Sequence, residues 1–295
     1  MRAAAMTHRP VQRWLSDGRV DLPEVTLVAV SSLAIAATLR ALHRSMRLIR
    51  FGAVKFLTDK APTQTGDGVE WVSIPPIASR GDYSHFMLKN LHQHVQTSHA
   101  LVAQWDGYVL HAHAWTDAFL AYDYIGAPWP QFDDGMTVGN GGFSLRSARL
   151  LSASATLPNG SGEAEDLIIG RRYRKYLEND HGVCFADEDV ARTFAFERLP
   201  SLGTEFGFHG VFNMATTLRE AEFRQVYGEV ETGLVGFREQ RDLIEIAIGR
   251  RSWPLMVDIL RPHFRSLRSW PSGLRLLTAG IAAYRRTRSG SGPSR

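Results

Sequence analysis

The chain has 295 residues, of which 44% are apolar and 22% are charged, the balance of an ordinary soluble globular protein. This length supports either one large α/β domain with appendages or two small domains. The single cysteine, Cys184, excludes a disulfide within the chain and a zinc site built from several cysteines.

The positive charge is concentrated at the carboxyl end. The net charge is +4, from 34 basic and 30 acidic residues, yet no acidic residue follows Asp258 and eight arginines do. This asymmetry indicates contact with an anionic membrane surface or another polyanion. We expect no nucleic-acid partner, because the tail carries no recognisable DNA- or RNA-binding motif.

No segment is long enough to span a membrane. The longest apolar stretch, residues 25–39, covers about fifteen positions and contains serine and threonine, against the roughly twenty that a span requires. The polar amino-terminal residues do not predict a signal peptide. We therefore expect a cytoplasmic protein.

The first elements form a β-α-β unit. Residues 1–22 form a polar, flexible lead-in, and the valine-rich run 25–30 predicts a strand buried on both faces. Ser31-Ser32 offers a cap for a helix over 33–46, and 51–57 predicts the next strand. Such a unit indicates a parallel pair of strands.

Further strands and helices alternate through the middle of the chain. We expect strands at 69–74, 100–104 and 183–185, and helices at 83–94, 114–120, 164–177 and 188–196. Four helices follow, at 218–227, 237–248, 254–260 and 274–286. The pattern predicts an α/β domain at 23–216, a helical extension at 217–286 and a disordered tail at 287–295.

Asp106 is the first candidate for chemistry. It follows the predicted strand 100–104 in the turn Gln104-Trp105-Asp106-Gly107. Open α/β sheets bind ligands at such strand ends, and carboxylates hold the Mg²⁺ or Mn²⁺ that a nucleotide diphosphate requires. A turn aspartate without a ligand is the alternative.

A glycine-rich turn, residues 139–142, is the second candidate. Its glycines permit positive φ and close approach of the backbone to a ligand, and its N–H groups can hold an anion or sugar hydroxyls. A hairpin without a ligand explains the same residues. No Gly-Lys-Ser/Thr follows, so the turn is not a Walker loop.

Three further positions carry suitable chemistry. Glu165-Asp166 opens a predicted helix, where one carboxylate can take a proton from a hydroxyl, although acids are favoured at helix starts in any case. His209 can complete a Mn²⁺ site or be structural. Trp129, in an aromatic-proline loop, can stack on a sugar or pack on the sheet.

Five motifs in one order carry a resemblance. They are QWDG, YDYIGAPW, VGNGGFSLRS, EDLIIGRRYRKYLE and FGFHG. Together they resemble a bacterial glycosyltransferase-like family of the GT-A type, over about residues 80–214. The resemblance implies a GT-A type, Rossmann-like mixed sheet flanked by helices, with a C-terminal helical extension.

The family's metal motif is Asp-x-Asp, and only its last acid is present in Gln104-Trp105-Asp106. The resemblance implies Asp166 as the base of an inverting transfer, with Glu165 as its alternate. Asp106 and His209 would then hold Mn²⁺ or Mg²⁺.

We therefore favour a metal-dependent, hexosyltransferase-like enzyme. It moves a sugar from a nucleotide-sugar donor, a UDP-sugar, to a hydroxyl of a glycan or lipid-linked acceptor, as in polysaccharide biosynthesis. The donor set consists of Ser31, Asp59, Gln104, Trp105 and Asp106. The acceptor and sugar set consists of Trp129, Asn140, Gly141 and Gly142.

Two rivals remain. The first is a non-catalytic nucleotide-sugar or carbohydrate-binding protein on the same fold. The second is a metal-dependent hydrolase that uses Asp106 with His111 and His113.

The carboxyl-terminal segment has two open interpretations. Its tryptophans and leucines, interleaved with arginines, form either an interfacial helix on anionic lipid or a subdomain packed on the core. The first would place the protein on the inner face of the cytoplasmic membrane.

Overall fold

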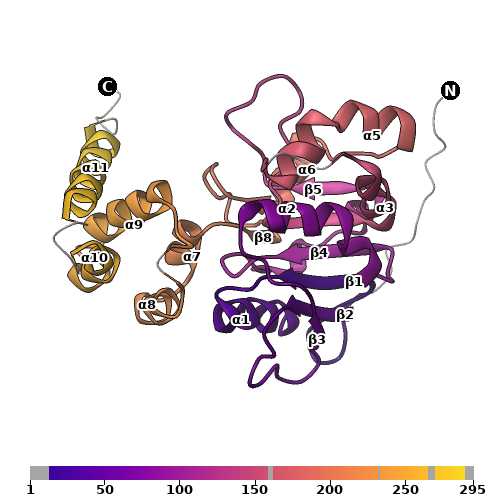
Figure 1. Ribbon diagram of the computed structural model, residues 1–295, viewed down its shortest axis with the longest axis horizontal. Coiled ribbons are helices and arrows are strands. Elements are labelled where there is room, and N and C mark those ends of the chain that lie inside the picture. Colours follow the sequence, from indigo (N-terminus) through magenta and orange to yellow (C-terminus); the bar gives the residue numbers. More distant parts are fainter. Residues whose placement is uncertain (1–12, 159–161, 232, 265–269, 290–295) are drawn as a thin grey trace.

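The computed structural model describes residues 13–158, 162–231, 233–264 and 270–289. A six-stranded mixed sheet with helices on both faces leads into a C-terminal array of helices (Figure 1). The expected mixed α/β fold with a helical extension is confirmed. Residues 1–12 of the expected lead-in and 290–295 of the expected tail lie outside the described residues. Where these segments are described, residues 20–22 begin a strand and residues 287–289 end a helix, so the expected bounds were wrong there.

The strand order of the main sheet is β3-β2-β1-β4-β6-β5. Its strands are β1 (Val20–Val30), β2 (Ile49–Thr58), β3 (Glu70–Ser73), β4 (His99–Ala103), β5 (Tyr124–Gly126) and β6 (Phe143–Ser147). The first four in this order pair in parallel, and β6 is antiparallel to both β4 and β5. A small second sheet pairs β7 (Ala195–Phe196) with β8 (Gly207–Phe208).

The helices of the sheet domain are α1 (Ile35–Met46), α2 (Arg80–Lys89), α3 (Ala148–Thr156), α4 (Glu165–Leu167), α5 (Arg174–His181) and α6 (Glu188–Phe194). The array contains α7 (Val211–Thr217), α8 (Glu220–Gly228), α9 (Phe237–Gly249), α10 (Trp253–Leu260) and α11 (Trp270–Ser289). Within the described residues, no helix combines the length and apolar character needed to cross a membrane.

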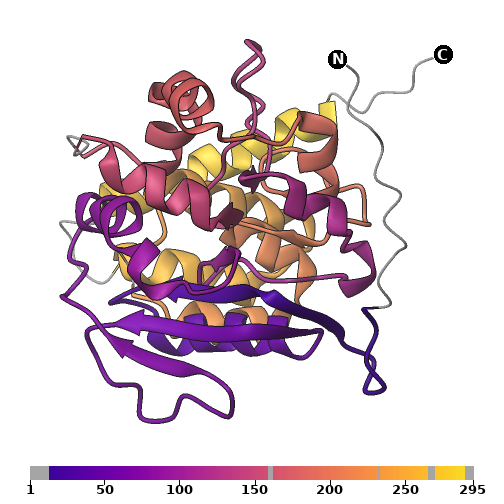
Figure 2. The ribbon, with the colours of Figure 1, turned by 90° about the vertical axis from the view of Figure 1, so that its right-hand side faces the viewer.

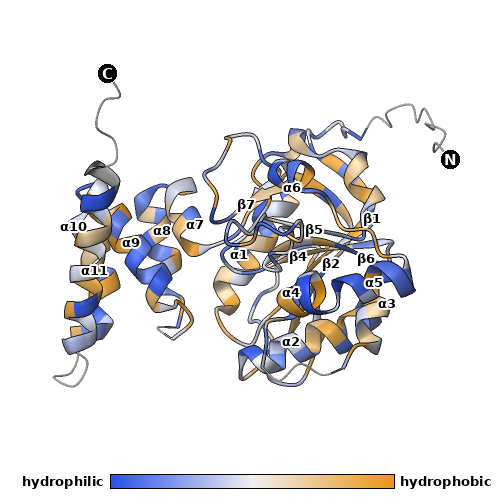
Figure 3. Cartoon of the chain, turned by 90° about the horizontal axis from the view of Figure 1, so that it is seen from above, coloured by the Kyte–Doolittle hydropathy of each residue, from blue (hydrophilic) through white to orange (hydrophobic). Residues whose placement is uncertain are grey.

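The two faces of the sheet are covered by different helices (Figure 2). Successive side chains of a strand point to opposite faces. In β1, Leu27 packs in one cluster with Leu42 of α1, and its neighbour Val28 packs in another with Phe86 of α2. The helices on each face of the sheet have one apolar and one hydrophilic side (Figure 3).

Helix α1 also contacts the C-terminal array. Ala34, Ala37 and Ala41 belong to a cluster that includes Met214 of α7 and Leu243 of α9. The array is therefore joined to the sheet domain by a continuous apolar core, with α1 between them.

Three expected elements differ. The predicted helix 164–177 consists of α4, a π-helical turn at Ile168–Arg172 and α5. Residues 183–185 form only an isolated bridge, Phe185 with Tyr124, and 114–120 falls in short 3₁₀ turns.

Neither Ser31 nor Ser32 caps α1. The Ser31 hydroxyl donates to Leu33 O, and the Ser32 hydroxyl accepts from the Ile77 N–H. The cap residue is instead Ala34, which has no side-chain cap of its own.

Strand β1 contains a β-bulge, and this bulge leaves no room for a side chain at Gly52 in the neighbouring strand β2. The register between β1 and β2 shifts between Leu22 and Thr26, and a Cβ added at Gly52 would overlap the carbonyl oxygen of Pro23. We expect Gly52→Ala to lower the free energy of unfolding by about 1–3 kcal/mol, measured by urea denaturation. Gly228→Ala, where the added atom meets open space, is the control and should change it by less than about 0.5 kcal/mol. Equal effects would contradict the overlap.

Candidate functional site

The candidate site lies where the parallel strands β1 and β4 end. The strand order reverses here: β2 lies on the outer side of β1, and β6 lies on the outer side of β4. Open α/β sheets bind ligands at such a switch in strand order. Because β6 is antiparallel and pairs Phe143 with Ala103, the glycine turn before Phe143 reaches the same edge.

A cavity of about 340 Å³, here called the switch-point cavity, opens at this edge. Three residues of the predicted donor set line it, namely Ser31, Gln104 and Trp105. Asp59 and Asp106 are not among its lining residues. Asp59 lies just beyond β2, with one carboxylate oxygen buried and unpartnered.

His209 lies among three oxygen-bearing side chains. Its Nε2 is 3.4 Å from Asp106 Oδ1 and 3.2 Å from Gln104 Oε1, and its Nδ1 is 3.3 Å from Glu197 Oε1. The Gly210 N–H also donates to Asp106 O at 3.1 Å, which ties the strand β4 end to the His209 segment. The predicted pair Asp106 and His209 is thus brought together.

The surroundings of His209 favour its charged form. Burial opposes that form, but the carboxylates of Asp106 and Glu197 outweigh burial and raise the pKa of His209 well above its ordinary value. In its charged form, the ring can donate from Nδ1 to Glu197 and from Nε2 to Gln104.

The donor set around His209 fits a hard divalent cation. In the described part of the chain, no three His, Cys, Asp or Glu side chains form a metal group. However, Asp106 Oδ1 is buried without a hydrogen-bond partner, and Gln104 Oε1 lies near the same imidazole nitrogen. Carboxylate and amide oxygens with an imidazole suit Mn²⁺ or Mg²⁺. Gln104 thus offers an oxygen at the position of the missing acid.

The glycine turn is shaped by its own neighbours. Gly139, Gly141 and Gly142 all have negative or extended φ, contrary to the expectation of positive φ. A Cβ at Gly141 would overlap Glu165, and one at Gly142 would overlap the ring of His209. The glycines are needed for this close packing.

The turn does not present its N–H groups to a ligand as expected. The Asn140 N–H donates to Ala127 O at 3.3 Å, and the Gly142 N–H donates to the Asn140 side chain at 3.1 Å. The Gly141 N–H donates to Asp166 Oδ2 at 3.1 Å. These N–H groups donate within the protein, so the turn positions the side chains of Asn140 and Asp166.

A fully buried arginine holds the turn in place. Arg146 is 0% exposed, and its guanidinium donates to Glu165 Oε1 at 2.9 Å, to Gly141 O at 3.2 Å and to Ser144 Oγ at 3.0 Å. Glu165 is therefore occupied by an ion pair.

Asp166 has the environment of a base that works near neutral pH. Burial, with the adjacent Glu165 carboxylate, raises the pKa of Asp166 to about 7. The N–H groups of Gly141 and Leu167 oppose this rise by donating to its carboxylate.

The two remaining predicted residues, Asn140 and Trp129, lie in different surroundings. Asn140 donates to Glu197 Oε2 at 2.9 Å and so belongs to the His209 network. Trp129 is only 5% exposed and lies against Gly139 and Gly170. Its role in sugar stacking stays a prediction.

The structure does not support a metal site at His111 and His113, which the hydrolase hypothesis requires. His111 Nδ1 donates to the backbone oxygen of Glu205 at 2.8 Å, and the His111 and His113 rings lie 5.4 Å apart. No metal group is formed by them in the described residues.

Glu197 and Tyr83 belong to the site but are not predicted from the sequence. Glu197 follows the aromatic run Phe194–Phe196, just as Asp106 follows a strand, so the same signal was available. The Tyr83 hydroxyl accepts from Gln104 Nε2 at 3.0 Å and lines the switch-point cavity. Burial and nearby Glu165 raise its pKa, so it stays neutral. Only the fold reveals this contact.

Residues 69–209 match a family model described as a protein of unknown function, DUF5672. The match contains Asp106, the glycine turn, Asp166, Glu197 and His209 but neither β1 nor the C-terminal array. No curated protein matches the chain.

We expect Arg146→Met to lower the free energy of unfolding by about 3–5 kcal/mol, because it leaves the Glu165 carboxylate buried without its cation. Urea denaturation measures this. Adding Glu165→Gln should recover part of the loss. The control, Arg149→Met on the exposed side of α3, should cost less than about 1 kcal/mol. A double variant no more stable than Arg146→Met would contradict the buried pair.

Proposed function

We propose that the protein is a GT-A type glycosyltransferase. It moves a sugar from a nucleotide-sugar donor, a UDP-sugar, to a hydroxyl of a glycan or glycolipid. One observation supports this most directly: the switch-point cavity adjoins a buried polar cluster through Gln104 and Tyr83. A ligand pocket and titratable groups with shifted pKa values mark a reaction site when they converge.

In this proposal, Asp106, Gln104 and His209 hold a divalent cation, Mn²⁺ or Mg²⁺. The bound cation supplies Lewis-acid stabilisation to the diphosphate leaving group. Glu197 orients His209 through Nδ1, as second partners of ligating imidazoles do.

Asp166 is the proposed base of an inverting transfer. A base works best with a pKa near the working pH, and burial gives Asp166 that property. Glu165 serves as the positioning residue of the pair, because Arg146 already occupies its carboxylate.

A non-catalytic nucleotide-sugar or carbohydrate-binding protein remains the second candidate. Gln104 in place of an acid favours it, because the site then has one fewer charged oxygen. Incubation with a panel of UDP-sugars and Mn²⁺ separates the two, since a mere binder leaves the donor intact.

Asp166→Asn tests the base. We expect transfer to fall by about a hundredfold or more while donor affinity, measured by calorimetry, is unchanged. In the wild type, transfer should rise with pH through about 7 and then level off, because only the deprotonated carboxylate accepts the proton. Asp180→Asn, on exposed α5, is the control. Near wild-type transfer by Asp166→Asn would rule out this assignment.

We further propose that the protein is cytoplasmic and contacts the inner face of the cytoplasmic membrane through α10 and α11. An apolar groove of about 780 Å³ lies between them, and Trp253 and Leu274 are 71% and 53% exposed. Arg261 lines the same groove. Apolar side chains beside arginines match an anionic lipid surface. Leu276, in contrast, is buried, so one face of α11 packs on the array.

Trp253→Ala should weaken sedimentation with vesicles of phosphatidylglycerol and phosphatidylcholine by about tenfold, since a large apolar side chain no longer enters the lipid. Trp71→Ala, at an exposed tryptophan on β3, is the matched control and should have no effect. Equal binding by wild type and Trp253→Ala would remove the membrane proposal.

A further inference from the structure

The amino terminus of α1 is capped by a residue from the distant C-terminal array. Ala34, with φ of 48°, has no side-chain cap of its own. Its N–H donates to Glu231 Oε2 at 2.8 Å. A carboxylate is thus bound where a helix attracts negative charge.

This helix terminus belongs to the switch-point cavity. Leu33, directly before Ala34, and Thr38, one turn later, both line the cavity. Thr38 is 1% exposed, and its hydroxyl is buried without a hydrogen-bond partner. An unpaired buried hydroxyl costs free energy unless a ligand satisfies it.

Two cationic side chains accompany the cavity. Lys60 Nζ donates to Ser32 O at 3.2 Å, and Arg80 lines the cavity. Both side chains belong to exposed residues. A phosphate group carries more charge and more acceptor oxygens than one carboxylate, so it can use the helix terminus and these cations together.

We propose that the amino terminus of α1 is a phosphate subsite of the switch-point cavity, which Glu231 occupies until a phosphorylated ligand displaces it. The identity of that ligand as a nucleoside diphosphate rests on the proposed function. The phosphate chemistry follows from the helix terminus, Thr38 and the nearby cations.

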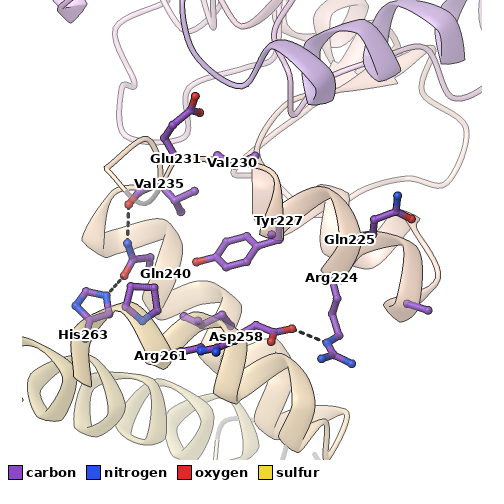
Figure 4. A pocket seen from close by; sticks show the side chains of 14 residues that line it. Arg224, Gln225, Tyr227, Val230, Glu231, Val235, Gln240, Asp258, Arg261 and His263 are labelled. Atoms are coloured by element: carbon purple, nitrogen blue, oxygen red, sulfur yellow. Dashed lines mark hydrogen bonds and ion pairs between the residues drawn. The ribbon is translucent and has the colours of Figure 1, made fainter. Parts of the chain in front are cut away.

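The segment that carries Glu231 has open space on its other side. Gly233 and Leu234 line the switch-point cavity, whereas Glu231 and Val235 line a second cavity of about 510 Å³ within the array. Figure 4 shows this second cavity, with the Glu231 carboxylate directed away from Tyr227 and Gln240. Glu231 can therefore withdraw without repacking a solid core.

Two contacts flank the displaceable carboxylate. Glu229 pairs with Arg40 of α1 through two hydrogen bonds of 2.9 and 2.7 Å. Val235 O accepts from Gln240 at 2.7 Å, and Gln240 in turn bonds His263 (Figure 4). These contacts hold the segment while the Glu231 contact changes.

The experiment is calorimetric titration of pyrophosphate into the full chain with a metal chelator present. Glu231→Gln keeps an acceptor oxygen but removes the competing charge, and should raise the affinity about fivefold or more. Glu229→Gln loosens the same segment outside the cavity and is the matched control, with a change below about twofold. An unchanged or weaker affinity for Glu231→Gln, or an equal rise in both variants, overturns the subsite.

Thr38→Val gives a second test. It removes the unpaired hydroxyl while keeping the shape of the side chain, so the melting temperature should not fall. Pyrophosphate affinity should fall about threefold or more, because the phosphate loses a donor. An unchanged affinity overturns the assignment of Thr38 and with it the subsite.

A parallel titration with UDP distinguishes the source of the phosphate. The same response to Glu231→Gln supports a nucleoside diphosphate, and a response to pyrophosphate alone overturns that choice in favour of the free ion. Because neither titration contains a transferable sugar, an acceptor or a metal, the subsite can be confirmed where sugar transfer fails. Transfer activity without any response to Glu231→Gln would reject the subsite alone.

Discussion

The buried ion pair between Arg146 and Glu165 is the interaction on which the site geometry depends. It joins β6 to α4, and the same guanidinium holds Gly141 O. Burying both charges carries a large desolvation cost, which these hydrogen bonds and the Tyr124 ring, 5.5 Å from the guanidinium carbon, help to offset. Asp166 follows Glu165 directly, so its position is fixed by the same pair.

Negative and positive side chains gather in different parts of the site. Around Arg146 and His209, the four carboxylates of Asp106, Glu197, Glu165 and Asp166 outnumber the two buried cations, which favours a further cation there. Lys60 bonds the segment before α1 and Arg80 lines the switch-point cavity, which favours an anion beside them. A metal-bound diphosphate, as in the proposed function, would meet both requirements at once.

Much of the sheet could be predicted from local pattern. The apolar runs of β1 and β2 and the position of Asp106 after β4 follow from short-range rules, and the structure places them as expected. The contacts of Glu197 and Glu231 could not be predicted, because their partners are far away in sequence.

The glycine turn and the broken helix differ from the sequence-based expectation for a related reason. Local rules assign glycine to positive φ, whereas Gly141 and Gly142 are required by the bulk of neighbouring side chains. Likewise, Gly170 lies in the π-helical turn beside Trp129, a contact that periodicity alone does not reveal.

Helix α1 belongs to two cores at the same time. Its leucines complete the core of the sheet, and its alanines Ala34, Ala37 and Ala41 face the C-terminal helices. A chain cut before α7, near residue 210, would leave that alanine stripe exposed to water. The sheet and the array are therefore expected to unfold in one cooperative transition, and the start of α7 separates two architectures within a single folding unit.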